Sequence, residues 1–155
     1  MQPYGGFWLR LVAYLIDGVI LNIAGWALGM VFGLAISLGG IGEDAAMGGV
    51  FALSGFSLVT GWLYSAVLES SQWQATVGKK ALSLVVTDEE GQRIGFGRAT
   101  ARYFAKILSM LILFFGFIMI GWTRRKQGLH DMIAGTLVYK ASSPDLVRNT
   151  ADVFN

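Results

Sequence analysis

One carboxylate lies inside a long apolar segment of the chain. Asp17 is the only charged residue among residues 11–38. A carboxylate at the centre of a lipid-facing helix costs roughly 2.5–3.5 kcal/mol, so such groups face a protein interior and usually have a partner. The position therefore favours one of two kinds of chemistry. Asp17 is either part of a proton or cation site, or a buried and paired residue that holds helices together.

The nearest candidate partner along the sequence is Arg10. It precedes Asp17 by seven residues, so on a helix the two lie on nearly the same face, with Arg10 about 10 Å closer to the end of the helix. Tyr14 lies between them and could relay a hydrogen bond. Glu69, at the end of a second apolar segment, is another candidate partner for Arg10.

The elements that must position these residues are apolar helices. The chain of 155 residues is 54% hydrophobic and 14% charged, whereas a soluble domain is about a quarter charged. Residues 11–38 and 45–68 each exceed the roughly 20 residues that cross the hydrocarbon layer, and residues 104–122 contain only one charge, Lys106. We expect an all-α membrane protein with two transmembrane helices and a third spanning or re-entrant helix.

Loop charges predict the orientation. The connection at residues 39–44 is acidic, with no Lys or Arg, whereas residues 70–103 carry five basic side chains. The positive-inside rule places the basic connection and the N-terminus in the cytoplasm. Residues 124–126 are all basic and directly follow the third apolar segment. They lie outside if that segment crosses the membrane, and inside if it forms a hairpin near Gly116.

The basic connection has structure of its own. Residues 81–87 are typical of a strand, residues 88–91 of a turn, and residues 92–94 could return as a second strand in a hairpin. Residues 97–106 predict a helix with basic residues four apart. This helix either rests on anionic lipid headgroups, at about 1 kcal/mol per basic residue, or is a solvated entrance to the third segment. The predicted interfacial basic residues are Lys79, Lys80, Arg98, Arg102 and Lys106.

Small residues recur at helical spacing in both long segments. Such spacing lets two membrane helices approach closely. We expect these stripes to meet either within one chain or between subunits, and we expect a homo-oligomer. The first stripe is Gly25, Gly29 and Gly33, and the second is Ser57, Gly61 and Ser65.

Three separated motifs carry a resemblance to a known family. They are residues 5–10 (GGFWLR) with the segment containing Asp17, residues 76–80 (TVGKK) continuing to Gly91, and residues 128–136 (GLHDMIAGT). In this order they resemble the RDD family of bacterial membrane proteins, named for one arginine and two aspartates. Their matches here are Arg10, Asp17 and Asp131. The resemblance implies a single domain over residues 1–140, a polar tail over residues 141–155, and a place in the bacterial cytoplasmic membrane.

The resemblance leads to a hypothesis about the site. Asp131 precedes a short apolar stretch, where a carboxylate is well suited to cap a helix. We expect Arg10, Asp17 and Asp131 to form one polar cluster near the cytoplasmic side. In the alternative, Asp131 caps only its own helix, and Arg10 pairs with Asp17 or Glu69.

Several classes of function are not expected. The chain has no cysteine and one histidine, His130, which excludes paired-histidine and thiolate metal sites. The segment at residues 76–80 lacks the Ser or Thr that a phosphate loop requires after its lysine. We expect no enzyme, cofactor or metal, and no nucleic-acid partner, because the basic residues flank membrane segments.

Two functional classes remain. The first is a transporter or channel for an ion, a proton or a small ligand. Transport of unidentified ligands has been suggested for the RDD family. The alternative is a membrane scaffold, assembly factor or regulator whose charges are structural. The expected partners are the lipid bilayer, including anionic lipids, and further copies of the chain. A transporter requires Asp17 to reach a water-filled cavity, whereas a scaffold requires it to be sealed and paired.

Overall fold

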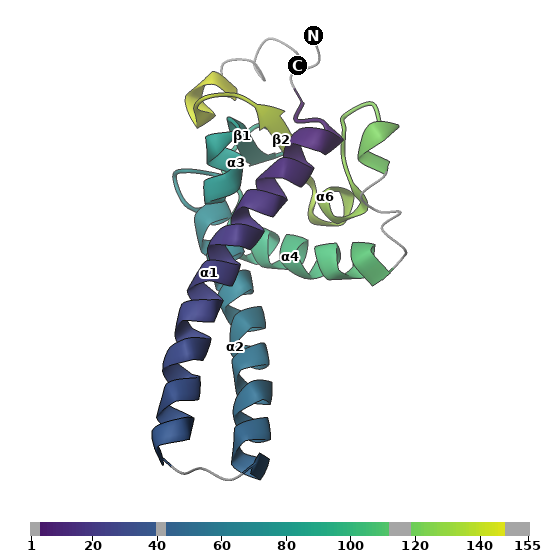
Figure 1. Cartoon of the computed structure of the whole chain (residues 1–155). Helices are drawn as coiled ribbons and strands as arrows, with labels where there is room; N and C mark the ends of the chain where they lie inside the picture. The colour runs from purple at the N-terminus through teal and green to yellow at the C-terminus, as the bar shows by residue number, and fades with distance from the viewer. Residues whose placement is uncertain (1–3, 40–42, 112–118, 148–155) are drawn as a thin grey trace.

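The chain folds into a long helical pair that carries a small head at one end. The computed structural model describes residues 4–39, 43–111 and 119–147. Figure 1 shows helices α1 and α2 side by side, with the other elements gathered where α1 begins and α2 ends. We call these other elements the head. In chain order the elements are α1 (Phe7–Gly39), α2 (Glu43–Ser70), α3 (Val77–Ala81), β1 (Leu84–Asp88), α4 (Phe96–Leu111), the 3-10 helix η1 (Met119–Gly121), α6 (Leu129–Ala134) and β2 (Thr136–Lys140).

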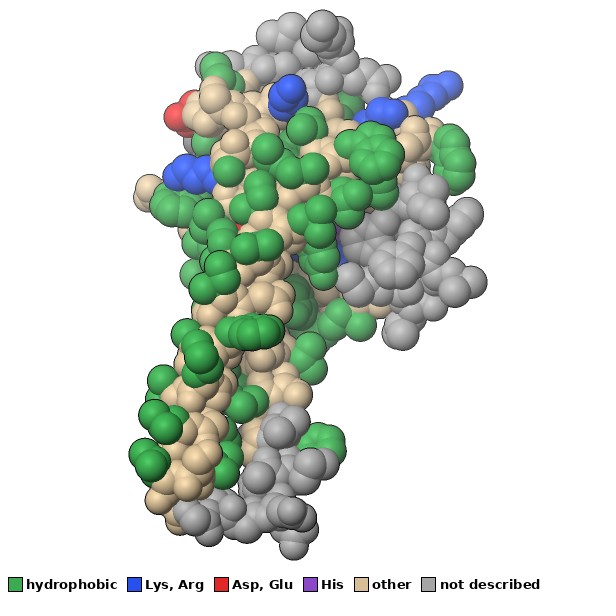
Figure 2. Space-filling view, viewed as in Figure 1, with side chains coloured by type: hydrophobic (Ala, Val, Ile, Leu, Met, Phe, Trp, Pro, Cys, Tyr) green, Lys and Arg blue, Asp and Glu red, His purple; other side chains and the backbone are tan. Residues whose placement is uncertain are grey.

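Helix α1 has the length and polarity of a transmembrane helix. Its 33 residues extend about 50 Å, and its most apolar part has a mean hydropathy of 2.1 and is not buried within the chain. Large apolar side chains are exposed along it (Figure 2). Among the described residues, α1 is the only helix that is both long enough and apolar enough to cross a membrane. The crossing of the membrane by α2, which contains the predicted second span, stays a prediction.

The third apolar segment does not coincide with a single described helix. Helix α4 begins at Phe96 and ends at Leu111, and residues 112–118 of the predicted span lie outside the described residues. Figure 1 shows α4 running across the α1–α2 pair and not along it. A third crossing is therefore not confirmed.

The predicted strand is confirmed, but the expected hairpin partner is wrong. Strand β1 pairs antiparallel with β2, in a register that places Val86 opposite Val138. Residues 92–94 contribute one backbone hydrogen bond, from the Asp88 N–H to the Gln92 carbonyl oxygen at 2.9 Å. Ile94 then turns into the core and the chain enters α4. The strand that pairs with β1 is therefore β2, which comes much later in the sequence.

The sheet is buried on both faces and attaches the head to the helical pair. One face contributes Leu84, Val86 and Val138 to a core shared with Ala13 of α1 and Ala66 of α2. The other face carries a second cluster, consisting of Val85, Leu137, Tyr139 and Val147. The head is therefore packed against the first turns of α1 and the last turns of α2.

The small-residue stripes do not meet in the described part of the chain. Apart from the neighbouring backbone of α1, no described atom lies within 4 Å of a Cβ built on Gly25, Gly29 or Gly33. The close approach between α1 and α2 is instead at Gly49, where a Cβ would meet Phe32 of α1, while Gly61 faces Tyr103 of α4. In the second stripe, Ser57 is exposed and Ser65 is half-buried. The expected contact between subunits stays a prediction.

Candidate functional site

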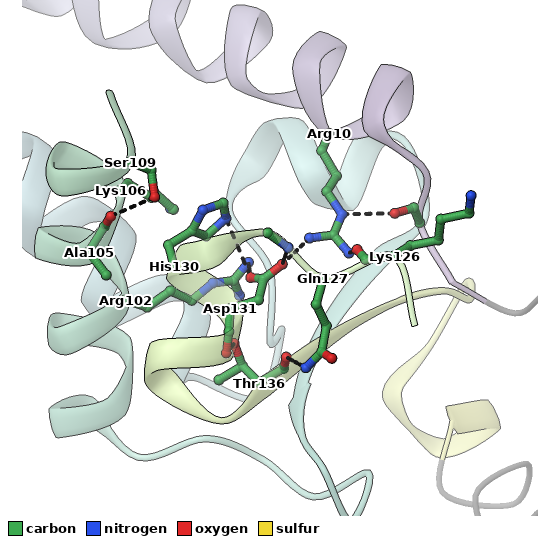
Figure 3. Close-up of polar contacts among 12 residues, drawn as sticks. Arg10, Arg102, Ala105, Lys106, Ser109, Lys126, Gln127, His130, Asp131 and Thr136 are labelled. Atoms are coloured by element: carbon green, nitrogen blue, oxygen red, sulfur yellow. Dashed lines mark hydrogen bonds and ion pairs between the residues drawn. The ribbon is translucent and has the colours of Figure 1, made fainter. Parts of the chain in front are cut away.

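Arg10 ties the start of α1 to the head. Its Nε donates to the Gly5 carbonyl oxygen at 2.8 Å, and its Nη2 donates to the Lys126 carbonyl oxygen at 2.5 Å. Its Nη1 donates to Oδ2 of Asp131, with which it forms an ion pair. Figure 3 shows these contacts converging on the guanidinium. The side chain is 8% exposed, so the three groups are joined away from bulk water.

Asp131 serves two structural roles at once. Its Oδ2 accepts a hydrogen bond from the Gly128 N–H at 3.2 Å and so caps α6. Its Oδ1 lies 2.8 Å from Nη2 of Arg102, a second buried cation. Burial alone raises the pKa of the Asp131 carboxyl, but the charges of Arg102 and Arg10 outweigh it and hold the pKa well below its usual range. The carboxylate therefore stays ionised between two arginines.

Glu69 extends the same set of charges toward α2 and α3. It is 1% exposed and accepts a hydrogen bond from Nζ of Lys79. Arg102 and Lys106 of α4 each approach its carboxylate to 3.5 Å. We call the whole set the charge network: Arg10, Glu69, Lys79, Arg102, Lys106 and Asp131. No direct Arg10–Glu69 ion pair is present among the described residues, and the two are connected through Arg102 and Asp131.

Asp17 lies apart from this network, so the hypothesis of one Arg–Asp–Asp cluster is wrong at this residue. Its Oδ1 accepts hydrogen bonds from the Tyr64 hydroxyl at 2.8 Å and the Gly78 N–H at 2.7 Å, and its Oδ2 accepts one from the Thr76 hydroxyl at 2.5 Å. These residues form the Asp17 site. Asp17 is two helical turns beyond Arg10, where α1 packs against α3. Tyr14 is half-exposed and makes no hydrogen bond to Arg10 or Asp17 in the described part of the chain.

Sequence reasoning missed the donors of the Asp17 site. A Cβ on Gly78 would overlap the Ala13 carbonyl oxygen and lie 3.0 Å from the carboxylate carbon of Asp17. Only glycine lets the backbone N–H come this close to the carboxylate. The neighbouring hydroxyl and glycine in residues 76–80 were a usable signal, because both can donate to an anion, but the sequence did not identify that anion.

The predicted stripe of interfacial basic residues divides in two. Arg102 is buried, and Lys79 and Lys106 also point toward Glu69, so they do not form part of an outward basic surface. Arg98 and Lys80 remain exposed, where Arg98 lies 3.6 Å from Asp88 and the Lys80 ammonium lies 3.5 Å from the centre of the Trp73 ring. The acids that draw the first group inward are on α2 and α6.

Helix α4 therefore has its polarity reversed relative to a helix of a soluble protein. Its charged side chains Arg102 and Lys106 point inward, toward the carboxylates on α2 and α6. In contrast, Phe104, Ile107 and Leu108 are exposed. A helix with an unburied apolar face of this kind suits a lipid environment.

His130 is buried beside Asp131 and the arginines. Burial, and after it the charges of Arg102, Lys106 and Arg10, lower the pKa of His130 to about 3, although the Asp131 carboxylate acts in the opposite direction. The imidazole is therefore neutral at pH 7.

A pH dependence of stability follows from His130. Between its ordinary pKa of 6.5 and the folded value of about 3, the unfolded chain binds a proton that the folded chain does not, so stability falls as the pH falls. We expect the Tm in neutral detergent to decrease from pH 7.5 to pH 5, and His130→Gln to show a smaller decrease. An equal decrease in both proteins would exclude His130 as its cause.

Comparison with known proteins identifies the family of the chain. The sequence profile of the RDD family matches residues 4–135. The chain belongs to the RDD family. The uncharacterized protein YxaI of Bacillus subtilis is 36% identical to it over 152 residues, which cover 90% of this chain and 100% of YxaI. The uncharacterized membrane protein YteJ of the same species is 29% identical over 145 residues, covering 88% and 81% of the two chains.

A third relative matches over a smaller part of each chain. The proline-rich antigen homolog of Mycobacterium tuberculosis is 36% identical over 64 residues, which are 41% of this chain and 27% of that protein. No solved structure matches the chain. In this RDD protein the arginine and the two aspartates occupy two sites: Arg10 and Asp131 pair in the charge network, and Asp17 is bound separately. Family membership and the exposed apolar surface of α1 give the protein the character of a membrane protein.

Proposed function

We propose that this RDD protein is a non-transporting membrane scaffold or regulatory protein, in which the RDD residues fix a cytoplasmic head to a membrane hairpin. The observation that carries the proposal is the environment of Asp17. Both of its oxygens accept hydrogen bonds from groups of the same chain, and the residue is 8% exposed. This is the sealed arrangement expected of a structural carboxylate.

A transport step would have to dismantle the Asp17 site. A hydrogen bond to a charged group contributes about 1.5–3 kcal/mol, and three of them hold this carboxylate to α2 and α3. A passing cation or proton would have to replace these donors. The described residues bring no cation to Asp17, so the site has the form of a joint between helices.

The placement in the membrane follows from the apolar surfaces. The hairpin of α1 and α2 crosses the bilayer, and α4 lies in the interfacial plane with Phe104, Ile107 and Leu108 toward the acyl chains. These side chains are exposed, and an amphipathic helix gains binding free energy by burying such a face at the membrane boundary. In this arrangement the basic residues 124–126 stay in the cytoplasm, as in the re-entrant interpretation.

Cysteine labelling tests this placement, because the chain has no native cysteine. In intact cells a membrane-impermeant maleimide is expected to label Gly39→Cys, at the exposed end of α1, without permeabilisation. Ser142→Cys and Arg125→Cys are expected to react only after permeabilisation. Labelling of Arg125→Cys from outside would show that the third apolar segment crosses the membrane.

Transport between subunits is the second candidate, favoured by a groove on the outside of α1. The groove is open and shallow, and its described lining belongs to α1, with Tyr14, Asn22, Trp26 and Met30 among its residues. A second copy of the chain could close it into a pathway of the kind expected from the sequence. Asp17 is not among the lining residues, which is why we place this candidate second.

Flux measurements in proteoliposomes separate the two candidates. The scaffold proposal predicts no proton, Na⁺ or K⁺ flux above empty liposomes for the parent protein, and a lower Tm for Asp17→Asn because the amide cannot accept all three hydrogen bonds with the strength of a carboxylate. Flux in the parent that Asp17→Asn abolishes, at matched insertion and oligomeric state, would overturn the proposal in favour of transport.

A further inference from the structure

The charge network contains more positive than negative charge. Among the described residues it has four basic side chains and two carboxylates, so its formal charge is +2. His130 adds none while it is neutral. Counting the separate Asp17 site with the network still leaves one surplus positive charge. Burial lowers the pKa of Lys79 to about 7, so the surplus is smaller than the formal count at neutral pH. Because uncompensated charge is costly to bury, the remaining surplus favours an added anion.

Two groups of the network are positioned to bind that anion. The Nε atom of Arg102 is buried and has no hydrogen-bond partner in the described part of the chain. Its Nη1 lies 3.5 Å from Oε2 of Glu69, and the side chain is 2% exposed. Lys106 is one helical turn along α4, on the same face, and its ammonium reaches Glu69 only at 3.5 Å. Its side chain is 18% exposed, which gives the network its access to the outside.

Three cations of the network surround Glu69. It accepts hydrogen bonds from Lys79 and, at 3.5 Å, from Lys106, and it lies at 3.5 Å from Arg102. Lys106 is the most exposed of these three cations, and the Nε–H of Arg102 has no acceptor among the described residues.

We propose that the α4 face of Arg102 and Lys106 is a binding site for a phosphate group, supplied either by an anionic lipid headgroup or by free phosphate. A guanidinium provides a planar set of donors that suits phosphate oxygens, and an ammonium adds a point charge. The lipid source rests on the proposed function, because only an interfacial α4 places these residues at headgroup depth. The phosphate offsets the surplus charge and fixes α4 to α2.

The test uses two variants of the same helix. Lys106→Gln removes a surplus charge from the site, and Arg98→Gln removes a charge from an exposed position of α4 that pairs with Asp88 outside the network. Both are expected to fold in neutral detergent, Arg98→Gln with a Tm close to that of the parent and Lys106→Gln with a somewhat lower Tm, because Lys106 contacts Glu69; the apparent Kd is therefore compared from the ligand-dependent shift of each variant's own Tm. Lys106→Arg keeps the charge and is expected to retain binding.

The measurement is the Tm of the purified full chain in neutral detergent, titrated with phosphatidylglycerol, with inorganic phosphate, or with uncharged diacylglycerol. We expect phosphatidylglycerol to raise the Tm of the parent and Arg98→Gln alike, with at least a tenfold weaker apparent Kd for Lys106→Gln. An equal response to inorganic phosphate identifies free phosphate as a sufficient ligand.

Three results would overturn the proposal: no response to either phosphate ligand, an unchanged apparent Kd in Lys106→Gln, or an equal loss in Arg98→Gln. The last would assign the response to general surface charge. The cysteine labelling described above is measured separately in intact cells, so failure of the phosphate site is distinguishable from failure of the proposed membrane placement.

Discussion

Replacing Asp131 with alanine is expected to lower the free energy of unfolding by about 3–5 kcal/mol, the usual cost of breaking a buried ion pair. The carboxylate lies between Arg10 and Arg102, and its removal leaves both guanidinium groups without their shared anion. It also removes the acceptor of the Gly128 N–H at the start of α6. The loss therefore combines charge imbalance with a missing helix cap.

Denaturant unfolding in neutral micelles, followed by tryptophan fluorescence, measures this loss. The matched control is Glu89→Ala, which removes an exposed carboxylate 3.8 Å from Arg125 and should change stability by less than about 1 kcal/mol. If Asp131→Ala were no more destabilising than Glu89→Ala, the charge network would not be a stabilising element.

Gly78→Ala is expected to have the second large effect. The new methyl group would overlap the Ala13 carbonyl oxygen, a backbone atom that cannot rotate away, and would lie 3.0 Å from the carboxylate of Asp17. Helix α3 must then move away from α1 and give up the N–H bond to Asp17. Overpacking of this kind costs about 1–3 kcal/mol, and the lost hydrogen bond to a charged group adds about 1.5–3 kcal/mol.

The control for this variant is Gly97→Ala in α4, where a Cβ meets no described atom within 4 Å apart from the neighbouring backbone. That substitution should be neutral or stabilising by up to about 1 kcal/mol, since alanine favours the helix. The measurement compares the Tm of Gly78→Ala with the Tm of Gly97→Ala, and Gly78→Ala is expected to have the lower value. Equal Tm values would mean that α3 does not depend on the close approach at Gly78.

Part of the site could be predicted from the sequence. Arg10 and Asp131 were expected to meet through the family resemblance, and the structure brings them together. Asp131 was also expected to cap a helix, because a carboxylate before a short apolar stretch can accept free backbone N–H groups. Both expectations rest on local chemistry or on a known motif, which a single sequence displays directly.

The other contacts depend on long-range packing, which the sequence pattern does not contain. Strand β1 could be recognised from its β-branched residues, but its partner β2 is separated from it by α4 and α6, and nothing in residues 92–94 excluded the nearer pairing. Asp17 was matched with Arg10 because helical periodicity made them neighbours. The neutral donors that bind Asp17 come from α2 and α3, whose positions periodicity does not give.

Helix α4 shows the same limit most clearly. The four-residue spacing of Arg98, Arg102 and Lys106 predicted one basic stripe on the helix. Only Arg102 and Lys106 turn inward, whereas Arg98 is exposed, and an amphipathic sequence does not reveal which face is buried. The answer depends on Glu69 and Asp131, which are remote in sequence and together neutralise part of the inward charge.

Hydrogen–deuterium exchange measures whether the RDD charges hold the head to the helical pair. Parent, Asp131→Asn and Glu89→Gln proteins are compared in the same neutral detergent. We expect Asp131→Asn to speed exchange in α3, β1, α6 and β2 by at least tenfold and to leave the middle of α1 unchanged, whereas Glu89→Gln should leave exchange in all of these elements unchanged. Unchanged protection of the head in Asp131→Asn would contradict the claim and remove the basis for a structural role of the network.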